Sequence, residues 1–125
     1  MAIYQVKAFA RFARQHRISR QALAAAATDV RDGRFDADLG GGLCKQRVAS
    51  QGSGKSGGFR TLITRRTSEH LFFVYGFPKN ARANIDAAET GALKAMAREF
   101  GALTQAQLDR LVEAGKLEVV SDGDQ

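Results

Sequence analysis

The feature that most constrains the fold is a basic, glycine-rich segment that runs directly into an apolar one. Residues 39–68 contain no acidic side chain, and residues 51–58 at their middle are mostly glycine and serine. Residues 71–77 are apolar at successive positions, which predicts a central strand covered on both faces. Strands joined by short turns predict an antiparallel sheet, and the cations of the segment predict a surface that holds phosphates. These cations are Lys45, Arg47, Lys55, Arg60, Arg65 and Arg66.

Helical patterns flank this strand-forming region. Apolar residues at helical spacing predict a helix over residues 7–16, with Lys7, Arg11 and Arg14 forming a basic stripe on its outer side. Ser19 is a suitable N-cap for a second helix that ends near Asp32. The other expected elements are strands at 3–6, 43–49, 59–67 and 117–120, a loop at 35–42, a turn at 51–58, and helices at 84–100 and 105–114. This order predicts an α+β domain.

The charge of the chain is unevenly distributed. The 125 residues suffice for one domain, and the net charge is +6. Residues 1–82 hold 15 lysines and arginines against five acids, a balance of +10, whereas residues 83–125 hold four against eight, a balance of −4. A polyanionic partner for the basic part follows from this split, although a merely solvated surface is the alternative. With one cysteine and no signal-like or membrane-spanning stretch, we expect a soluble cytoplasmic protein.

Residues 49–56 fit a loose form of the phosphate-binding loop of nucleotide triphosphatases. That mechanism needs a helix directly after the lysine, because the helix N-terminus holds the phosphate. Here a turn and a strand follow Lys55, so we favour a hairpin turn over a nucleotide site. Lys55 at the tip of such a turn could instead reach an RNA phosphate as a point charge.

Few other side chains suggest acid–base or metal chemistry. His16 and His70 form no cluster with acids or Cys44 at the spacing of metal ligands, so we expect no metal and no cofactor. We expect His16 to be a structural residue, His70 to be exposed, and the thiol of Cys44 to be buried. Arg60, beside the glycine turn, has few acids available as partners in this part of the chain. Tyr75 could stack on a base or fill the core, and its alternation with neighbouring phenylalanines favours the core.

Three segments resemble the RelE/HigB toxins of bacterial type II toxin–antitoxin systems. They are Gly-Lys-Ser-Gly-Gly-Phe-Arg-Thr-Leu-Ile at 54–63, Leu-Phe-Phe-Val-Tyr-Gly-Phe-Pro-Lys-Asn-Ala-Arg-Ala-Asn-Ile at 71–85, and Glu89 with Leu93-Lys94. Together with the segment at 36–49, they are most similar to a sub-branch that carries this signature. The resemblance covers about residues 1–100 and implies two N-terminal helices packed on a twisted antiparallel sheet, with a C-terminal helical extension at about 101–120 of one domain spanning 1–125.

The resemblance also implies roles for individual residues. Arg60 matches the arginine that contacts the scissile phosphate, and Lys55 and Arg47 resemble the basic residues around it. Lys79 and Arg82 match a basic cluster after the last long strand, where scaffolds often carry active groups. The chain departs from the family pattern at Asn80, where arginine is common, and at Asp86, near a position often held by tyrosine.

The expected function is that of a ribosome-dependent mRNA endonuclease that inhibits translation. Such cleavage can use the 2′-OH of RNA as the nucleophile without a metal, and cations stabilise the extra negative charge of the phosphorane. We expect Arg60, Lys55, Lys79 and Arg82 to act on the phosphate, and Lys45, Arg47, Arg65 and Arg66 to bind RNA. The expected partners are a cognate antitoxin, mRNA and the ribosome. The alternatives are a non-catalytic nucleic-acid-binding module and a gyrase-directed toxin of the same fold.

Overall fold

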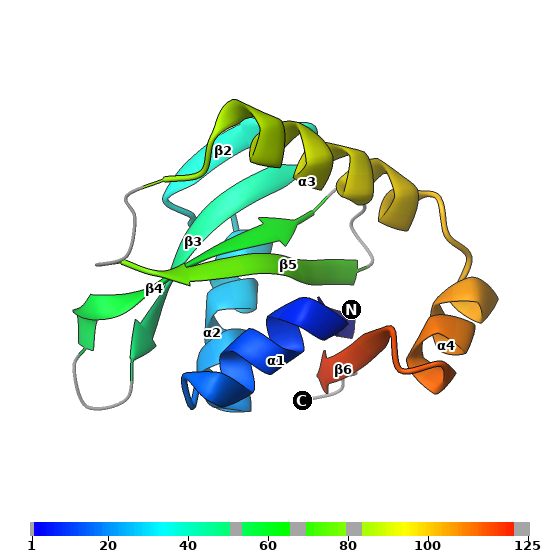
Figure 1. Cartoon of the computed structure of the whole chain (residues 1–125), viewed down its shortest axis with the longest axis horizontal. Coiled ribbons are helices and arrows are strands. Elements are labelled where there is room, and N and C mark those ends of the chain that lie inside the picture. The colour runs from blue at the N-terminus through cyan, green and yellow to red at the C-terminus, as the bar shows by residue number, and fades with distance from the viewer. Residues whose placement is uncertain (1, 51–53, 66–69, 80–83, 122–125) are drawn as a thin grey trace.

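The structure is a computed structural model that describes residues 2–50, 54–65, 70–79 and 84–121, with the backbone alone described at residues 50 and 54–57. Six strands form one sheet, with helices on both of its faces (Figure 1). The elements in chain order are β1 (Ala2–Val6), α1 (Lys7–Gln15), α2 (Arg20–Arg31), β2 (Ala37–Gly40), β3 (Leu43–Ser50), β4 (Gly54–Thr64), β5 (His70–Pro78), α3 (Ala87–Gly101), α4 (Gln105–Glu113) and β6 (Leu117–Ser121). The α+β class expected from the sequence is confirmed.

The strand order across the sheet is β2-β3-β4-β5-β1-β6. All neighbouring strands are antiparallel except β1 and β5, which run parallel. The prediction of a wholly antiparallel sheet is therefore wrong for this pair. The apolar strand β5 lies inside the sheet, and its residues 71–74 are buried, as the apolar run at 71–77 predicts.

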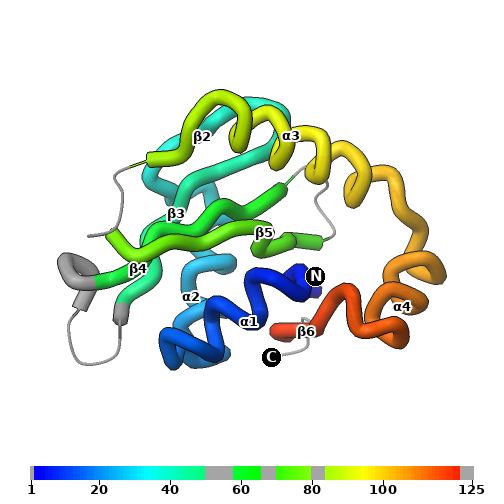
Figure 2. The backbone as a smooth tube through the Cα atoms, viewed as in Figure 1, coloured from blue at the N-terminus to red at the C-terminus, as the bar shows by residue number. Residues whose placement is uncertain are grey.

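Two apolar clusters cover the two faces of the sheet. Helices α1 and α2 pack on one face with Phe9, Leu23, Ile63 and Phe73, and α3 and α4 pack on the other with Leu62, Phe72, Leu93 and Leu108. We call these the α1 face and the α3 face. The backbone trace shows α3 crossing above β2 and β3, with α1 and α2 on the opposite side (Figure 2).

The expected boundaries differ most from the structure at three places. The predicted loop at 35–42 contains the four-residue strand β2. Strand β4 begins at Gly54, within the predicted turn. Helix α3 begins at Ala87 rather than near Asn84, because the side chain of Asp86 accepts a hydrogen bond from the amide of Glu89, and Glu89 bonds back to the amide of Asp86.

A bulge in the pairing of β4 with β5 changes which face the later residues of β5 occupy. Ile63 pairs with Phe73, but the preceding residue Leu62 pairs with Tyr75, so that Val74 is extra on β5. Tyr75 therefore lies on the α3 face with Leu62, while Phe73 lies on the α1 face. The sequence predicts that Tyr75 shares one face of the strand with both Phe73 and Phe77. This is wrong for Phe73, because only Phe77 lies on the same face as Tyr75.

Candidate functional site

Two arginines lie opposite each other on the α3 face. Arg47 of β3 pairs directly with Arg60 of β4, and two residues along the strands Lys45 pairs with Leu62. Directly opposed residues of antiparallel strands share a face and have Cβ atoms about 5 Å apart. Leu62 belongs to the cluster beneath α3. All three cations are therefore presented on the α3 face, and we refer to Arg47 and Arg60 as the arginine pair.

The arginine pair carries hydrogen-bond donors that have no partner among the described residues. Nε of Arg47 and Nη1 of Arg60 are buried atoms and make no hydrogen bond within the described structure. Like charges directly opposite each other destabilise a sheet, and a buried donor without an acceptor costs free energy. A phosphate would relieve both penalties, because guanidinium groups donate in pairs to its oxygens.

One acid approaches the arginine pair without neutralising it. Oδ2 of Asp36 lies 3.9 Å from Nε of Arg47, too far for a hydrogen bond, and the two side chains are 36% and 37% exposed. Exposed ion pairs of this kind contribute little free energy. Asp36 therefore neutralises little of the positive potential of the pair, which can attract an external anion.

Two aromatic side chains of β5 lie beside these cations on the α3 face, each in line with one of the cross-strand pairs of β3 and β4. Phe77 pairs with Arg60, and Tyr75 pairs with Leu62 in the row of Lys45. Phe77 is buried, whereas Tyr75 is partly exposed. The hydroxyl of Tyr75 donates to Oε2 of Glu89 at 3.3 Å, which ties the strand to the first turn of α3. The sequence pattern does not predict the bulge, and therefore does not predict that Tyr75 lies on the same face as the cations.

The other predicted site residues are not all near this pair. Lys79 is exposed and directly follows Pro78, whose partner Phe59 precedes Arg60 on β4, so Lys79 lies at the same end of the sheet. The side chain of Lys55 lies outside the described residues, as do Arg66 and Arg82. Arg65 packs over the ring of Phe35 at 5.1 Å, and Phe35 belongs to the α1 face, so the sheet separates the Arg65 side chain from the arginine pair.

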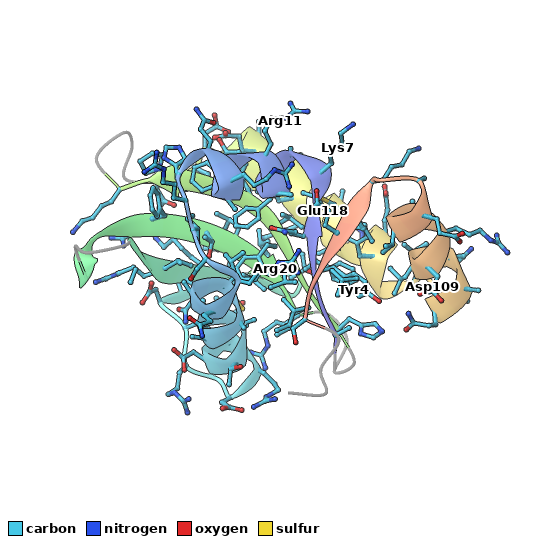
Figure 3. All side chains as sticks on the ribbon, turned by 90° about the horizontal axis from the view of Figure 1, so that it is seen from below. Tyr4, Lys7, Arg11, Arg20, Asp109 and Glu118 are labelled. Carbon is cyan, nitrogen blue, oxygen red and sulfur yellow. The ribbon has the colours of Figure 1, made fainter. Side chains whose placement is uncertain are left out.

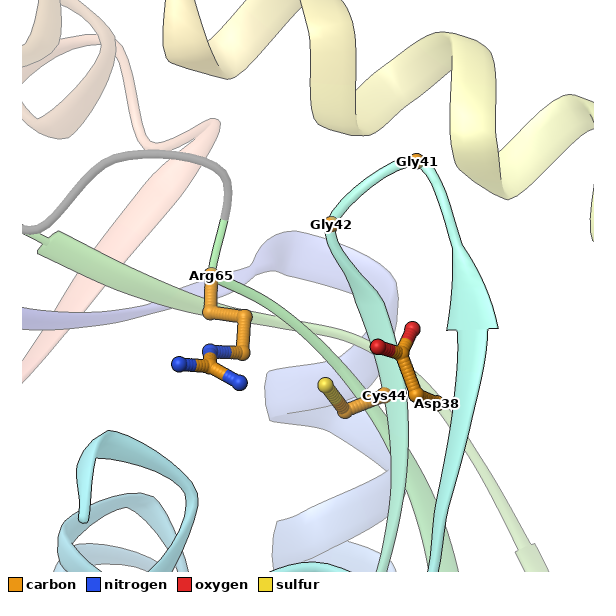
Figure 4. A pocket seen from close by; sticks show the side chains of 5 residues that line it. All are labelled: Asp38, Gly41, Gly42, Cys44 and Arg65. Carbon is orange, nitrogen blue, oxygen red and sulfur yellow. The ribbon is translucent and has the colours of Figure 1, made fainter. Parts of the chain in front are cut away.

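Arg65 instead lines a pocket of about 420 Å³ with Asp38, Gly41, Gly42 and Cys44. The Cys44 thiol and the Arg65 guanidinium point toward each other across it (Figure 4). Burial raises the pKa of the Cys44 thiol, and the charge of Arg65 opposes this shift. The thiol is free and buried, as expected, and the raised pKa keeps it protonated at neutral pH.

The histidines lie away from the arginine pair. His16 contacts the ring of Phe59 at 5.1 Å on the α1 face and is partly buried, which confirms its structural placement. His70 begins β5, seven residues before Phe77, which corresponds to about 23 Å along a strand. It is half-buried rather than exposed, because its ring accepts a hydrogen bond from the Ala2 amide and contacts Oε1 of Gln105.

The backbone of residues 54–64 does not have the geometry of the phosphate-binding loop that residues 49–56 resemble in sequence. Residues 54–56 lie within strand β4, so no helix begins after Lys55 and the geometry of that nucleotide site is absent there. Within the described residues, no three His, Cys, Asp or Glu side chains gather to hold a metal.

A second group of cations lies on the outer side of α1. Lys7 and Arg11 are exposed and point away from the sheet (Figure 3). Arg14, on the same stripe, forms an ion pair with Glu118 of β6 at 3.1 Å. The stripe is thus present as expected, on the face opposite the arginine pair. No helix in the described ranges is long and apolar enough to cross a membrane.

The chain matches a protein-family model. The model of the family described as "RelE toxin of RelE / RelB toxin-antitoxin system" matches residues 1–120, which is nearly the whole chain and includes α4 and all of β6 except its last residue. A search among curated proteins finds no match.

Proposed function

Since the chain belongs to the RelE toxin family of toxin–antitoxin systems, we propose that it is the toxin of such a pair and an endonuclease that cuts mRNA on the ribosome in the cytoplasm. Its proposed place within the family is the sub-branch of RelE/HigB-type toxins that carries the sequence signature of residues 54–63 and 71–85. The observation that supports the activity most directly is the arginine pair, with its buried unused donors facing the side of α3.

The proposed reaction is an internal transfer at phosphorus. The 2′-oxygen loses its proton and forms a bond to the adjacent phosphorus, the bond from phosphorus to the 5′-oxygen breaks, and that oxygen takes up a proton. Negative charge accumulates on the phosphoryl oxygens in the transition state. Cationic donors fixed beforehand at those oxygens lower the barrier more than mobile water does.

The proposed role of each cation depends on its position in the sheet. Arg60 and Arg47 hold the scissile phosphate, and Lys45 holds a neighbouring phosphate on the same face. Lys79, at the same end of the sheet as Arg60, is proposed to act near the leaving oxygen, and Lys55 and Arg82 keep the phosphate roles implied by the resemblance. Arg66 stays a proposed RNA contact. Arg65, on the α1 face, is removed from the proposed contacts of the cleaved strand.

Paired substitutions test the proposal. Arg60→Ala should lower mRNA cleavage in a translating extract by about 100- to 1,000-fold, the usual effect of removing one preorganised donor. Arg65→Ala removes the same charge from the residue that directly follows the same strand, but on the other face of the sheet, and should leave cleavage within about threefold. Circular dichroism and the melting temperature verify that both variants fold.

The same assay separates the alternatives. A folded Arg60→Ala variant that cleaves like the wild type would remove the arginine pair from the mechanism. Growth arrest by the wild type without any new 5′ ends in mRNA would favour a binding module or a gyrase-directed toxin. Equal losses in both variants would show that net charge, rather than the geometry of the α3 face, determines activity.

A further inference from the structure

Asp36 is an acid that the fold holds at the edge of the arginine pair. Its Oδ2 lies 3.9 Å from Nε of Arg47, and Arg47 lies opposite Arg60 on the neighbouring strand. The amide of Asp36 donates to the carbonyl of Lys45 at 3.0 Å, which fixes the backbone of Asp36 against β3, the strand that carries Arg47. The carboxylate is therefore placed beside the proposed phosphate site by main-chain pairing rather than by a free loop.

The carboxylate of Asp36 is not engaged in other contacts. Among the described residues its oxygens accept no hydrogen bond, and its side chain is 36% exposed. The acids at the start of α3 differ in this respect. Oε1 of Glu89 accepts from the Asp86 amide and Oε2 from the Tyr75 hydroxyl, and Oδ1 of Asp86 accepts from the Glu89 amide. Asp36 thus offers oxygens that a substrate can reach.

Neither stability nor affinity for RNA explains an acid at this position. An exposed ion pair at 3.9 Å contributes little to the free energy of unfolding. A carboxylate also repels a phosphate, so Asp36 should lower the affinity of the site for RNA. A role in proton transfer accounts for it, because the proposed reaction removes a proton from the 2′-OH and an arginine cannot accept one.

We propose that Asp36 is the general base of the cleavage reaction. One of its carboxylate oxygens takes the proton of the 2′-OH while the 2′-oxygen forms its bond to the phosphorus held by Arg47 and Arg60. The bond from phosphorus to the 5′-oxygen breaks, that oxygen takes up a proton from water or Lys79, and Asp36 returns its own proton to water. The products are a 2′,3′-cyclic phosphate and a 5′-hydroxyl. The inference rests on the proposed function and names a catalytic residue for it.

The spacing of Asp36 and Arg47 fits this role. A guanidinium donor lies about 2.7–2.9 Å from a phosphate oxygen that it binds. The attacking oxygen lies about 3–3.5 Å from phosphorus, and a general base lies about 2.6–3.2 Å from the oxygen that it deprotonates. A carboxylate oxygen 3.9 Å from the guanidinium can meet these distances in one complex, with the 2′-oxygen between the carboxylate and the phosphorus.

The first measurement is the rate of a single turnover with excess protein on purified ribosomes that carry a defined mRNA. Asp36→Asn keeps the shape of the side chain but cannot take up the proton, and should lower the cleavage rate about 100-fold or more. Asp32→Asn is the matched control, because Asp32 is 37% exposed, ends α2 and pairs with Arg31 on the surface. It removes the same charge and should leave the rate within about threefold.

The second measurement separates proton transfer from binding. The probe is the same ribosome complex with a 2′-O-methyl mRNA, which cannot be cleaved because its 2′-oxygens are blocked. Asp36→Asn should bind this complex as tightly as the wild type or more tightly, since the substitution removes a negative charge beside the phosphate. Undiminished binding also verifies that the variant is folded.

The third measurement separates the base from the acid that serves the leaving group. In an mRNA with a 5′-phosphorothiolate at the cleaved bond, sulfur replaces the leaving oxygen and departs without a proton. The loss caused by Asp36→Asn should persist on this mRNA, because the 2′-OH must still be deprotonated.

The outcomes distinguish this inference from the proposed function. Wild-type rates in Asp36→Asn, recovery of its rate on the 5′-phosphorothiolate, or weaker binding that accounts for its whole loss would each overturn Asp36 as the base. In all three cases the wild type still cleaves mRNA, so the proposed function stands. A wild type that binds programmed ribosomes without cutting the mRNA would remove the nuclease and the base together.

Discussion

Helix α1 packs closely against the sheet at Gly76. A Cβ atom built there would lie 2.6 Å from Cε2 of Phe12 and 2.9 Å from Cε1 of Phe9. Phe9 is almost fully buried, and its ring stacks on Phe73 at 5.0 Å, so it has little room to move. The glycine is thus required by close packing between helix and strand rather than by an unusual backbone angle.

Gly76→Ala should therefore destabilise the protein. Insertion of a methyl group into a packed core usually costs about 1–3 kcal/mol in the free energy of unfolding. Urea denaturation followed by circular dichroism would measure the change. Gly91→Ala is the control, because a Cβ at Gly91 in helix α3 meets no atom within 4 Å and alanine favours the helix. Equal stability of Gly76→Ala and the wild type would mean that both Phe12 and Phe9 can move away from the added methyl group.

The positions of some residues could be predicted from the sequence and those of others could not, for physical reasons. The local chemistry of Asp86 and Glu89 is a complete capping box, yet the periodic apolar residues around Ile85 made the helix seem to begin earlier. Strand β2 alternates between half-buried and exposed positions over only four residues, and the glycines at its end are typical of a loop. The bulge at Val74 depends on the register in which β4 and β5 pair, which local sequence patterns do not report, and it decides that Tyr75 lies on the face of Arg47 and Arg60.

Among the elements, the C-terminal pair α4 and β6 is joined to the domain on several sides. Leu108 and Leu117 are each 1% exposed and belong to the cluster of the α3 face, and β6 pairs with β1. Arg20 of α2 donates to the carbonyl of Val119 at 2.9 Å, which covers the outer edge of β6. The segment expected as an extension thus completes the core.

Substitutions at neighbouring positions of β6 test this view. Leu117→Ala should lower the free energy of unfolding by about 2–5 kcal/mol, as for other buried leucines. Glu118→Ala should change it by less than about 1 kcal/mol, because its ion pair with Arg14 is largely exposed. Chemical denaturation of both variants provides the measurement. Comparable, small effects would indicate an appendage that folds separately from the sheet.

At the scale of the whole molecule, the two faces of the sheet differ in their chemistry. The α3 face presents Lys45 and the arginine pair at a site of unused donors, while α1 presents Lys7 and Arg11 on a solvated stripe. Both groups belong to residues 1–82, which carry the balance of +10. We propose that the antitoxin of this toxin covers the basic α3 face with an acidic segment, because that would occupy the donors that RNA needs.

Charge reversals on the two faces distinguish this proposal from attraction by net charge alone. Lys45→Glu with Arg47→Glu should slow association with the antitoxin about tenfold at low salt, since steering depends on complementary charge at the contact. Lys7→Glu with Arg11→Glu changes the net charge equally, but on the α1 side, and should slow association much less. The difference should shrink as the salt concentration rises, because screening shortens the range of the field. Stopped-flow association rates over a salt series give the measurement, and rates of the wild type that do not depend on salt would instead indicate an apolar contact as the main anchor.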